Sequence, residues 1–285
     1  MSTTDLVVGA DVPLDLTFSD EELAEVRERA TEFVANVVEE AGADGAVIGL
    51  SGGIDSSTVA YLASEALGPE NVHGLVMPSD VTSDESTSDG ERVAEALGIE
   101  YDVIDVAPVV ASVLDAAPDP GLRDRAETGT EPAQTAVGNV RVRARAVLNY
   151  VVANAEERVV LGTGNRSEAM TGYYTKYGDQ AVDCNPIGPL YKQQVRQLAT
   201  DLGVPASIVE KPPSAEMWLD QTDEGELGLD YDTLDAILAL HVDGPLSTAA
   251  TVRTLDDVTE TQVKRVDDLV ATSEHKRHMP PAPEL

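Results

Sequence analysis

The feature that most constrains this chain is the string Ser51-Gly-Gly-Ile-Asp-Ser-Ser57, because it joins a predicted strand to a predicted helix. The apolar run 46–50 precedes the string, and apolar residues at helical spacing follow it over 58–63. Glycines permit a tight turn close to an anion, and a helix N-terminus adds free N–H groups and a positive dipole end. A plain strand–turn–helix corner uses similar residues, but the complete string in this position predicts a phosphate-binding loop.

Asp55 does not suit a loop that only holds phosphate, because a carboxylate and a polyphosphate repel each other. A divalent cation between them removes the conflict, so Asp55 is a candidate Mg²⁺ ligand. The string lacks the Lys that precedes Ser or Thr in a Walker A loop, and it lacks the Gly-x-Gly-x-x-Gly spacing of dinucleotide-binding loops.

The order of the predicted elements indicates an α/β fold. Strands are predicted at 46–50, 72–77, 101–106 and 158–161, and helices at 20–41, 58–63, 86–97 and 134–155. This alternation predicts one domain over 1–285 with a parallel twisted sheet flanked by helices, whose ligands bind at the carboxyl ends of the strands. The last 60 residues are expected to be helices packed on the same core. Flexible termini are predicted at 1–20 and 279–285, and a mobile loop rich in Pro, Gly and acid at 115–133.

The charge balance limits the partners that this chain can bind. It has 52 acidic and 19 basic residues, a formal net charge of −33, and only five lysines. Such a surface repels nucleic acid and anionic membranes. The acids are spread over amphipathic segments, so we hypothesise a solvated acidic surface suited to high salt.

The cysteine count and the N-terminus indicate a cytoplasmic protein. Cys184 is the only cysteine, which excludes an internal disulfide and a Cys-based metal site and suits a reducing compartment. Residues 1–20 show no signal-peptide pattern, and no apolar run approaches the length of a membrane span.

A second polar string, Gly162-Thr-Gly-Asn-Arg-Ser-Glu168, follows the predicted strand at 158–161. Because parallel strands end at the same edge of a sheet, this string is expected to open beside the first loop. Glu168 could then be a second carboxylate on the metal, or it could be an exposed acid in the first turn of a helix. The residues alone leave both possibilities open.

The chain as a whole resembles the ammonia-dependent NAD synthetases, which belong to the PP-loop ATP pyrophosphatases. The matching strings occur in family order and cover nearly the whole chain: Gly49-Leu-Ser-Gly-Gly-Ile-Asp-Ser56, Gly138-Asn-Val-Arg-Val-Arg-Ala-Arg145, Leu161-Gly-Thr163, Thr171-Gly-Tyr-Tyr-Thr-Lys-Tyr-Gly-Asp179, Lys211-Pro-Pro-Ser-Ala215, Gln221-Thr-Asp-Glu-Gly-Glu-Leu-Gly228 and Glu274-His-Lys-Arg277. The fold that this resemblance implies is that of the adenine-nucleotide α-hydrolases, which is Rossmann-like.

The resemblance implies a carbon–nitrogen ligase that amidates deamido-NAD with ammonia and ATP. It implies an adenylated intermediate, the products NAD, AMP and pyrophosphate, and thus the last step of NAD biosynthesis. Asp55 and Lys192 would be catalytic, and Asp55 and Glu168 would hold Mg²⁺. The ATP contacts would be Gly49, Leu50, Ser51, Gly52, Gly53, Ile54, Asp55, Ser56, Thr163, Lys192 and Ser214. The deamido-NAD contacts would be Arg143, Lys176, Asp183, His275 and Lys276, and the family pattern is a homodimer with the dinucleotide at the subunit interface.

Several single residues admit two interpretations. Lys176 and Lys276 fall in the matched strings, and the resemblance assigns Lys192 to ATP, which favours a function for these three of the five lysines as compact charges. Arg141 and Arg145 are expected in salt bridges or interface contacts. Cys184 is expected to be a small buried hydrophobe rather than a nucleophile. Two further features stay open: Trp218 and the tyrosines of 173–177 could stack on a ligand ring or pack in the core, and Glu216-Met217 departs from the family pattern.

Three other classes compete with this interpretation. A tRNA-modifying PP-loop enzyme is disfavoured by the single cysteine and the negative charge, and a GMP synthetase-like amidotransferase by the string 171–179. A non-catalytic nucleotide sensor is disfavoured by the paired carboxylates Asp55 and Glu168, since a sensor needs no second metal ligand.

Overall fold

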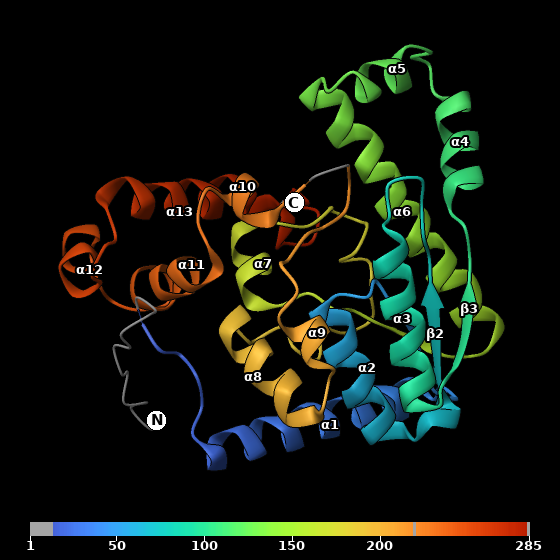
Figure 1. The fold of residues 1–285 in the computed structure, drawn as a ribbon, viewed down its shortest axis with the longest axis horizontal. Helices are drawn as coiled ribbons and strands as arrows, with labels where there is room; N and C mark the ends of the chain where they lie inside the picture. Colours follow the sequence, from blue (N-terminus) through green and yellow to red (C-terminus); the bar gives the residue numbers. More distant parts are fainter. Residues whose placement is uncertain (1–13, 219–220, 284–285) are drawn as a thin grey trace.

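The protein is built around a four-stranded parallel sheet (Figure 1). The computed structural model describes residues 14–218 and 221–283. The strands have the order β3-β2-β1-β4, and their bounds are β1 (Ala46–Gly49), β2 (Val72–Val76), β3 (Glu100–Val103) and β4 (Val159–Leu161). In register, Ala46 lies opposite Val72 on one side and Val159 on the other. The predicted α/β class and parallel sheet are confirmed.

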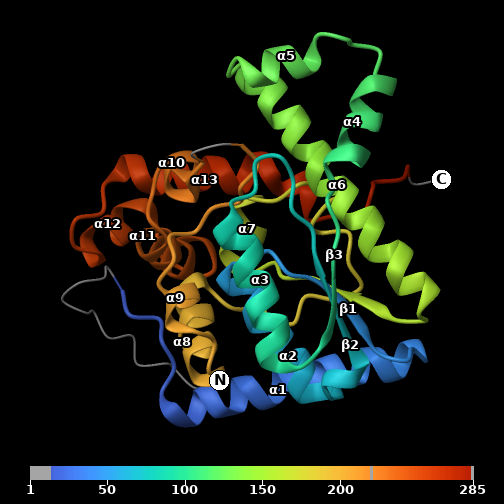
Figure 2. The same cartoon turned by 45° about the vertical axis from the view of Figure 1, so that its right-hand side comes forward.

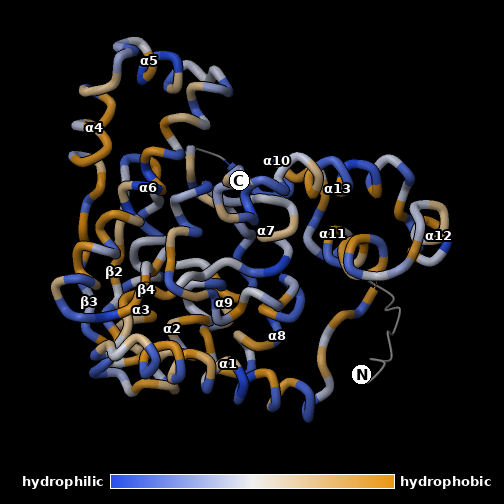
Figure 3. Tube along the Cα trace, turned by 180° about the vertical axis from the view of Figure 1, so that it is seen from behind, coloured by the Kyte–Doolittle hydropathy of each residue, from blue (hydrophilic) through white to orange (hydrophobic). Residues whose placement is uncertain are grey.

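Helices cover both faces of the sheet, because successive strand residues point to opposite faces. Ala46 and Ile48 pack in one apolar cluster with helices of the first layer, which are α1 (Asp20–Ala41), α2 (Ile54–Leu67), α3 (Asp84–Leu97), α8 (Lys192–Leu202) and α9 (Ala206–Val209). Val47 and Val160 pack in a second cluster with α4 (Ala107–Ala116) and α6 (Glu131–Ala155). Except in β3, where Glu100 and Asp102 are exposed, the strands carry mainly hydrophobic residues between these layers (Figure 3).

The C-terminal helices form a core of their own, beside the sheet (Figure 1). Their bounds are α10 (Asp223–Leu227), α11 (Tyr231–Ile237), the π-helical turn η2 (Leu238–Val242), α12 (Thr248–Thr254), α13 (Glu260–Ser273) and η3 (Glu274–Lys276). Fully buried Leu234 and Ile237 pack there with Val263 and Val266. The prediction that these helices share the sheet's core is therefore corrected, because their apolar faces pack mainly on one another.

The segment 14–20 contributes to that second core. Leu14 and Leu16 are buried in it, and the amide of Gln193 donates to the Leu14 carbonyl at 3.3 Å. This packing was not expected in a segment predicted to be flexible. The rest of that prediction, residues 1–13, lies outside the described residues, as do residues 284–285 of the predicted flexible C-terminus.

Helices α4, α5 (Leu122–Glu127) and the first half of α6 project from the body (Figure 2). The segment 115–133, predicted as a loop, thus contains a short helix, and its mobility stays a prediction. Val109 and Val113 on α4 are exposed, one turn apart. The remaining elements are the short helices η1 (Pro69–Asn71) and α7 (Arg166–Thr171). Within the described ranges, no helix is both long and apolar enough to cross a membrane.

Candidate active site

A cavity of about 850 Å³ lies where the strands of the sheet end. It is lined by the residues that follow β1, by the end of β2, and by Leu161, Gly162 and Thr163 at the end of β4. Helix α6 and the segment 211–218 complete its walls. A cavity at the carboxyl edge of a parallel sheet is where this class of fold binds its ligands.

The loop after β1 is shaped by hydrogen bonds between its own serines. The Ser51 backbone N–H donates to Ser56 Oγ at 3.2 Å, and Ser56 Oγ donates to the Gly53 carbonyl at 3.1 Å. Gly52 has φ +76°, and a Cβ there would lie 2.1 Å from the Ser86 carbonyl, so only glycine fits. Gly53 is the N-cap of α2 and brings no side chain to the first-turn N–H groups. The helix therefore presents those donors to an incoming anion.

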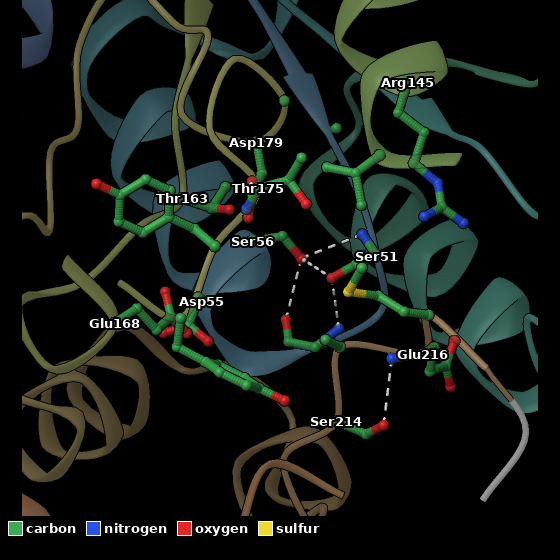
Figure 4. A pocket seen from close by; sticks show the side chains of 18 of the residues that line it. Ser51, Asp55, Ser56, Arg145, Thr163, Glu168, Thr175, Asp179, Ser214 and Glu216 are labelled. Atoms are coloured by element: carbon green, nitrogen blue, oxygen red, sulfur yellow. Dashed lines mark hydrogen bonds between the residues drawn. The ribbon is translucent and has the colours of Figure 1, made fainter. Parts of the chain in front are cut away.

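Asp55, Glu168 and Lys192 meet at one end of the cavity, although they come from α2, α7 and α8. Lys192 Nζ donates to Asp55 Oδ2 at 2.5 Å and lies 3.7 Å from Glu168 Oε1. The Asn165 amide donates to the other Asp55 oxygen at 2.9 Å. Figure 4 shows Asp55 and Glu168 side by side, across the cavity from Arg145 and Glu216.

Glu168 was expected to be either a metal ligand or an exposed acid in the first turn of a helix, and its local structure decides part of this choice. Glu168 does belong to the first turn of α7, where it forms a capping box with Asn165. Its side chain is only 19% exposed and lines the cavity, so it is not the exposed helix acid that was considered.

The charges in this cluster perturb one another. Burial and, next to it, the Asp55 charge raise the pKa of the Glu168 carboxyl to about 8, although the Lys192 charge lowers it. Burial opposes the charge on Lys192, but Asp55 and Glu168 outweigh it, so the pKa of the ammonium is raised. Two carboxylates held this close would be relieved by a second cation.

These residues fit a Mg²⁺ ion that is shared with a phosphate ligand. Asp55 and Glu168 both direct oxygen donors into the cavity beside the phosphate loop. In the described parts of the chain, no group of three acidic, His or Cys side chains could enclose a metal alone. Mg²⁺ commonly uses one or two carboxylates and completes its shell with phosphate oxygens and water.

Most of the residues expected to contact ATP line this one cavity. Gly52 is the exception, because it packs behind the loop against α3. Thr163 lines the cavity after β4, and Ser214 lines it from the segment 211–218. The Ser214 hydroxyl donates to the Gln221 carbonyl at 2.7 Å, which fixes the course of this segment.

The residues expected to contact deamido-NAD lie in three separate places. Lys276 lines the cavity, where its ammonium donates to the carbonyls of Gly172 and Tyr174 at 2.6 and 2.8 Å. Two other cations lie outside the cavity lining, close to one another. There, Lys176 Nζ donates to the His275 carbonyl at 2.6 Å, and Arg143 donates to the Lys176 carbonyl at 3.1 Å.

Asp183 lies in a third place, also outside the cavity lining. Its carboxylate accepts hydrogen bonds from the Tyr150 hydroxyl at 3.0 Å and the Val160 backbone at 2.7 Å. The neighbouring Cys184 is partly buried, and burial raises the pKa of its thiol to about 11, with the charge of Asp183 adding to the effect. A thiol that stays protonated suits the expected packing role and not a nucleophile.

The two arginines expected in salt bridges differ. Arg141 is buried and pairs with Asp80 at 3.0 Å, as expected. No salt bridge is found for Arg145 among the described residues, which rules out that alternative there, and an interface contact of Arg145 stays a prediction. It donates instead to the Met77 carbonyl at 2.9 Å, and its guanidinium lines the cavity.

One buried polar group next to Lys192, the carboxylate of Asp223, was not predicted from the sequence. Asp223 accepts hydrogen bonds from the hydroxyls of Tyr173 at 3.0 Å and Tyr231 at 2.9 Å, and it lines the cavity. The string 221–228 was its only signal. Glu216, a departure from the family pattern, accepts a hydrogen bond from the Ser86 hydroxyl at 2.6 Å and so ties the segment 211–218 to α3.

The amino-acid sequence matches known proteins over most of its length. The family model described as NAD synthase matches residues 26–280. The NH3-dependent NAD+ synthetase of Halobacterium salinarum is 60% identical over 271 residues, which are 95% of this chain and 97% of that relative. The enzyme of the same name from Hyperthermus butylicus is 48% identical over 89% of this chain and 88% of its own length.

Solved structures agree with the fold. The NMN synthetase from Francisella tularensis superposes with a TM-score of 0.77 at 31% identity, covering 94% of this chain and all of that one. The NH3-dependent NAD synthetase from Campylobacter jejuni, in complex with a nitrate ion, superposes with a TM-score of 0.73 at 28% identity. That match covers 92% of this chain and 99% of the Campylobacter chain.

Proposed function

This chain belongs to the NAD synthase family, and on that premise we propose that it amidates deamido-NAD with ammonia at the expense of ATP. The products are NAD, AMP and pyrophosphate, and an adenylated deamido-NAD is the intermediate. The observation that carries the proposal is the meeting of Asp55, Glu168 and Lys192 beside a phosphate-binding loop.

The loop and α2 would bind the triphosphate of ATP. The serine hydroxyls and the free N–H groups of the first turn are donors for phosphate oxygens. Asp55 and Glu168 would hold Mg²⁺, which would supply positive charge to neutralise the phosphates when bound. Lys192 is almost fully buried and would add a fixed positive charge next to the leaving pyrophosphate.

The first chemical step brings two anions together, since the substrate carboxylate attacks the α-phosphorus and displaces pyrophosphate. The main task of the site is therefore electrostatic stabilisation and positioning. Lys192 is held between two carboxylates, so its ammonium is oriented before substrates arrive. In the second step ammonia attacks the activated carbonyl, the C–O bond to AMP breaks, and the amide forms.

The deamido-NAD contacts require a second chain in this proposal. Arg143, Lys176 and His275 are grouped outside the cavity that would hold ATP. A homodimer would let such residues serve the site of a neighbouring subunit. Exposed valines, which include Val109 and Val113 on projecting α4 and Val147 and Val151 on α6, supply apolar surface for an interface between subunits.

A product analysis tests the function. The purified chain is incubated with ATP, Mg²⁺, ammonium and deamido-NAD, and nicotinate mononucleotide replaces deamido-NAD in a parallel reaction because one structural relative is an NMN synthetase. We expect equal amounts of NAD, AMP and pyrophosphate with deamido-NAD. Formation of ADP, absence of turnover, or a preference for the mononucleotide would reject the proposal.

Two variants on the same helix complete the test. Asp55→Ala removes the carboxylate proposed to hold the metal, and we expect it to abolish AMP formation at every ammonium concentration. Glu65→Ala is the control, because Glu65 lies near the other end of α2 and pairs with Arg27 at the surface. Full activity of Asp55→Ala would show that this carboxylate has no catalytic part.

A further inference from the structure

An aspartate in the second core lies beneath the candidate active site. Asp235 belongs to α11, and 0% of its surface is exposed. Its neighbours in the helix, Leu234, Ala236 and Ile237, are apolar core residues. A carboxylate buried among such residues is costly unless hydrogen bonds compensate for the lost hydration.

The hydrogen bonds of Asp235 lead to the two helices that carry the site. The Ser167 hydroxyl donates to Asp235 Oδ1 at 2.5 Å, and the Gln193 backbone N–H donates to Oδ2 at 3.0 Å. Ser167 Oγ in turn accepts from the backbone N–H of Lys192 at 3.1 Å. Ser167 directly precedes Glu168, so one carboxylate connects the first turns of α7 and α8.

We propose that Asp235 is a positioning residue for adenylation, which holds Lys192 and Glu168 in register with Asp55 by joining the first turns of α7 and α8. The inference rests on the proposed function, because it concerns the same site. Asp235 does not touch the cavity, and it acts only through Ser167 and the backbone of α8.

The geometry of the site explains why such a connection matters. Lys192 and Glu168 belong to different helices, yet Lys192 Nζ lies 2.5 Å from Asp55 Oδ2 and 3.7 Å from Glu168 Oε1. Misplacement by about 1 Å can reduce a rate by as much as roughly a hundredfold. Helix α11 also supports the side chain, because the Tyr231 ring centre lies 5.0 Å from Lys192 Nζ. The backbone and the ammonium of Lys192 are thus both held from α11.

The same pair of helices offers a matched control. Asp232 lies one turn before Asp235 on α11 and pairs with Arg196 of α8 at 2.8 Å. The Asp232 side chain is 33% exposed and contacts neither Ser167 nor Lys192. Asp232→Ala therefore removes a contact between α11 and α8 without disturbing the first turns.

The test compares Asp235→Ala, Asp235→Asn, Ser167→Ala and Asp232→Ala with the wild type. Three quantities are measured for the full chain: kcat with the KM of each substrate, the affinity for Mg·ATP alone by calorimetry, and the melting temperature. We expect Asp235→Ala and Ser167→Ala to lower kcat about tenfold or more and to weaken Mg·ATP binding. The KM for deamido-NAD should change little, and Asp232→Ala should stay within about twofold in kcat.

Asp235→Asn separates positioning from bulk stability. Its amide oxygen can still accept from Gln193, and its amide nitrogen can donate to Ser167 Oγ, so we expect it to recover most of the kcat lost in Asp235→Ala. If Asp235→Ala does not fold, the kcat and Mg·ATP affinity of Ser167→Ala test the positioning role, since this variant removes only one hydroxyl.

The outcomes distinguish this inference from the proposed function. Variants that fold and keep wild-type kcat and Mg·ATP affinity would overturn the positioning role while the wild type still makes NAD. A lower melting temperature with unchanged kcat per folded molecule would also overturn it. A wild type that makes no NAD would reject the function, whereas Mg·ATP binding that depends on Asp235 would still support the positioning role.

Discussion

At the scale of single residues, the site depends on charges that compensate one another. Lys192 is buried, and its ammonium lies between Asp55 and Glu168. Removing one partner of such a group leaves the other charges buried and uncompensated, which costs more than a lost surface ion pair. Burial and the Asp55 charge raise the pKa of Glu168 to about 8, so they disfavour its charged form in this cluster.

Lys192→Met is therefore expected to affect stability as well as activity. Without ligands, the free energy of unfolding should fall by about 3 kcal/mol, and AMP formation should be lost. Lys264→Met is the control, because Lys264 pairs with Glu260 on the exposed face of α13 and should change stability by less than about 0.5 kcal/mol. Urea titrations give the free energy of unfolding of the two variants. Equal losses of stability in both would show that Lys192 does not compensate the buried carboxylates.

The role of a residue could be predicted from the sequence where a motif or a family resemblance defines that role. Asp55 and Thr163 stand in quoted strings and Lys192 was assigned through the family resemblance, and the structure brings all three to one cavity. Asp235 could not be found in this way, because the sequence alone does not distinguish a buried acid in a helix from an exposed one. The absence of a salt bridge at Arg145 among the described residues could not be foreseen for a related reason, since a partner on another element cannot be read from spacing along one helix.

At the scale of elements, α11 links the second core to the site, and this link should depend on pH. Burial raises the pKa of Asp235 from 3.8 to about 7. The hydrogen bonds from Ser167 and Gln193 and the charge of Arg196 lower it, while Asp232 raises it. Because the folded-state pKa exceeds the unfolded value, the protonated form stabilises the fold. That contribution is complete below about pH 4 and is lost as the pH rises through about 7.

Asp235→Asn should remove this pH dependence. Relative to the wild type, its free energy of unfolding should increase between pH 4 and pH 8, by up to roughly 4 kcal/mol for a shift of about three pKa units. Urea titrations at several pH values measure the difference. A difference between the two proteins that stays constant with pH would contradict the assigned direction of the shift.

The elements themselves were largely predictable because their boundaries carry local signals. The capping box of Ser19 and Glu22 begins α1, and Gly42 and Gly98 end α1 and α3 in the left-handed conformation. Helix α5 was missed, because the Pro and Gly residues that mark a loop flank this short helix instead of interrupting it. The separate second core was missed because pairing between helices depends on tertiary packing.

At the scale of the whole molecule, we hypothesise that the formal net charge of −33 makes stability depend on salt. The Debye length falls from about 30 Å at 0.01 M salt to about 3 Å at 1 M. We therefore expect the melting temperature and the activity to rise as KCl increases from dilute buffer to molar concentrations. Thermal unfolding monitored by circular dichroism measures this, and a protein that is fully folded and active without salt would refute the hypothesis.

The proposed homodimer can be tested by mixing two inactive variants. Asp55→Ala disables one side of the site, and Arg143→Ala removes a cation that lies outside the cavity of its own chain. If sites are shared, each mixed dimer has one intact site, so an equilibrated equal mixture should regain about a quarter of wild-type activity. A mixture as inactive as its components, or a monomer by light scattering, would contradict shared sites.

In the proposed reaction, AMP passes from ATP to the carboxylate of deamido-NAD within the cavity. Deamido-NAD labelled with ¹⁸O in its nicotinate carboxylate tests this directly in a single reaction with ATP, Mg²⁺ and ammonium. Attack of the carboxylate on the α-phosphorus predicts one ¹⁸O atom in each AMP and none in pyrophosphate, as read by mass spectrometry. Unlabelled AMP, or ¹⁸O in inorganic phosphate formed together with ADP, would contradict the account.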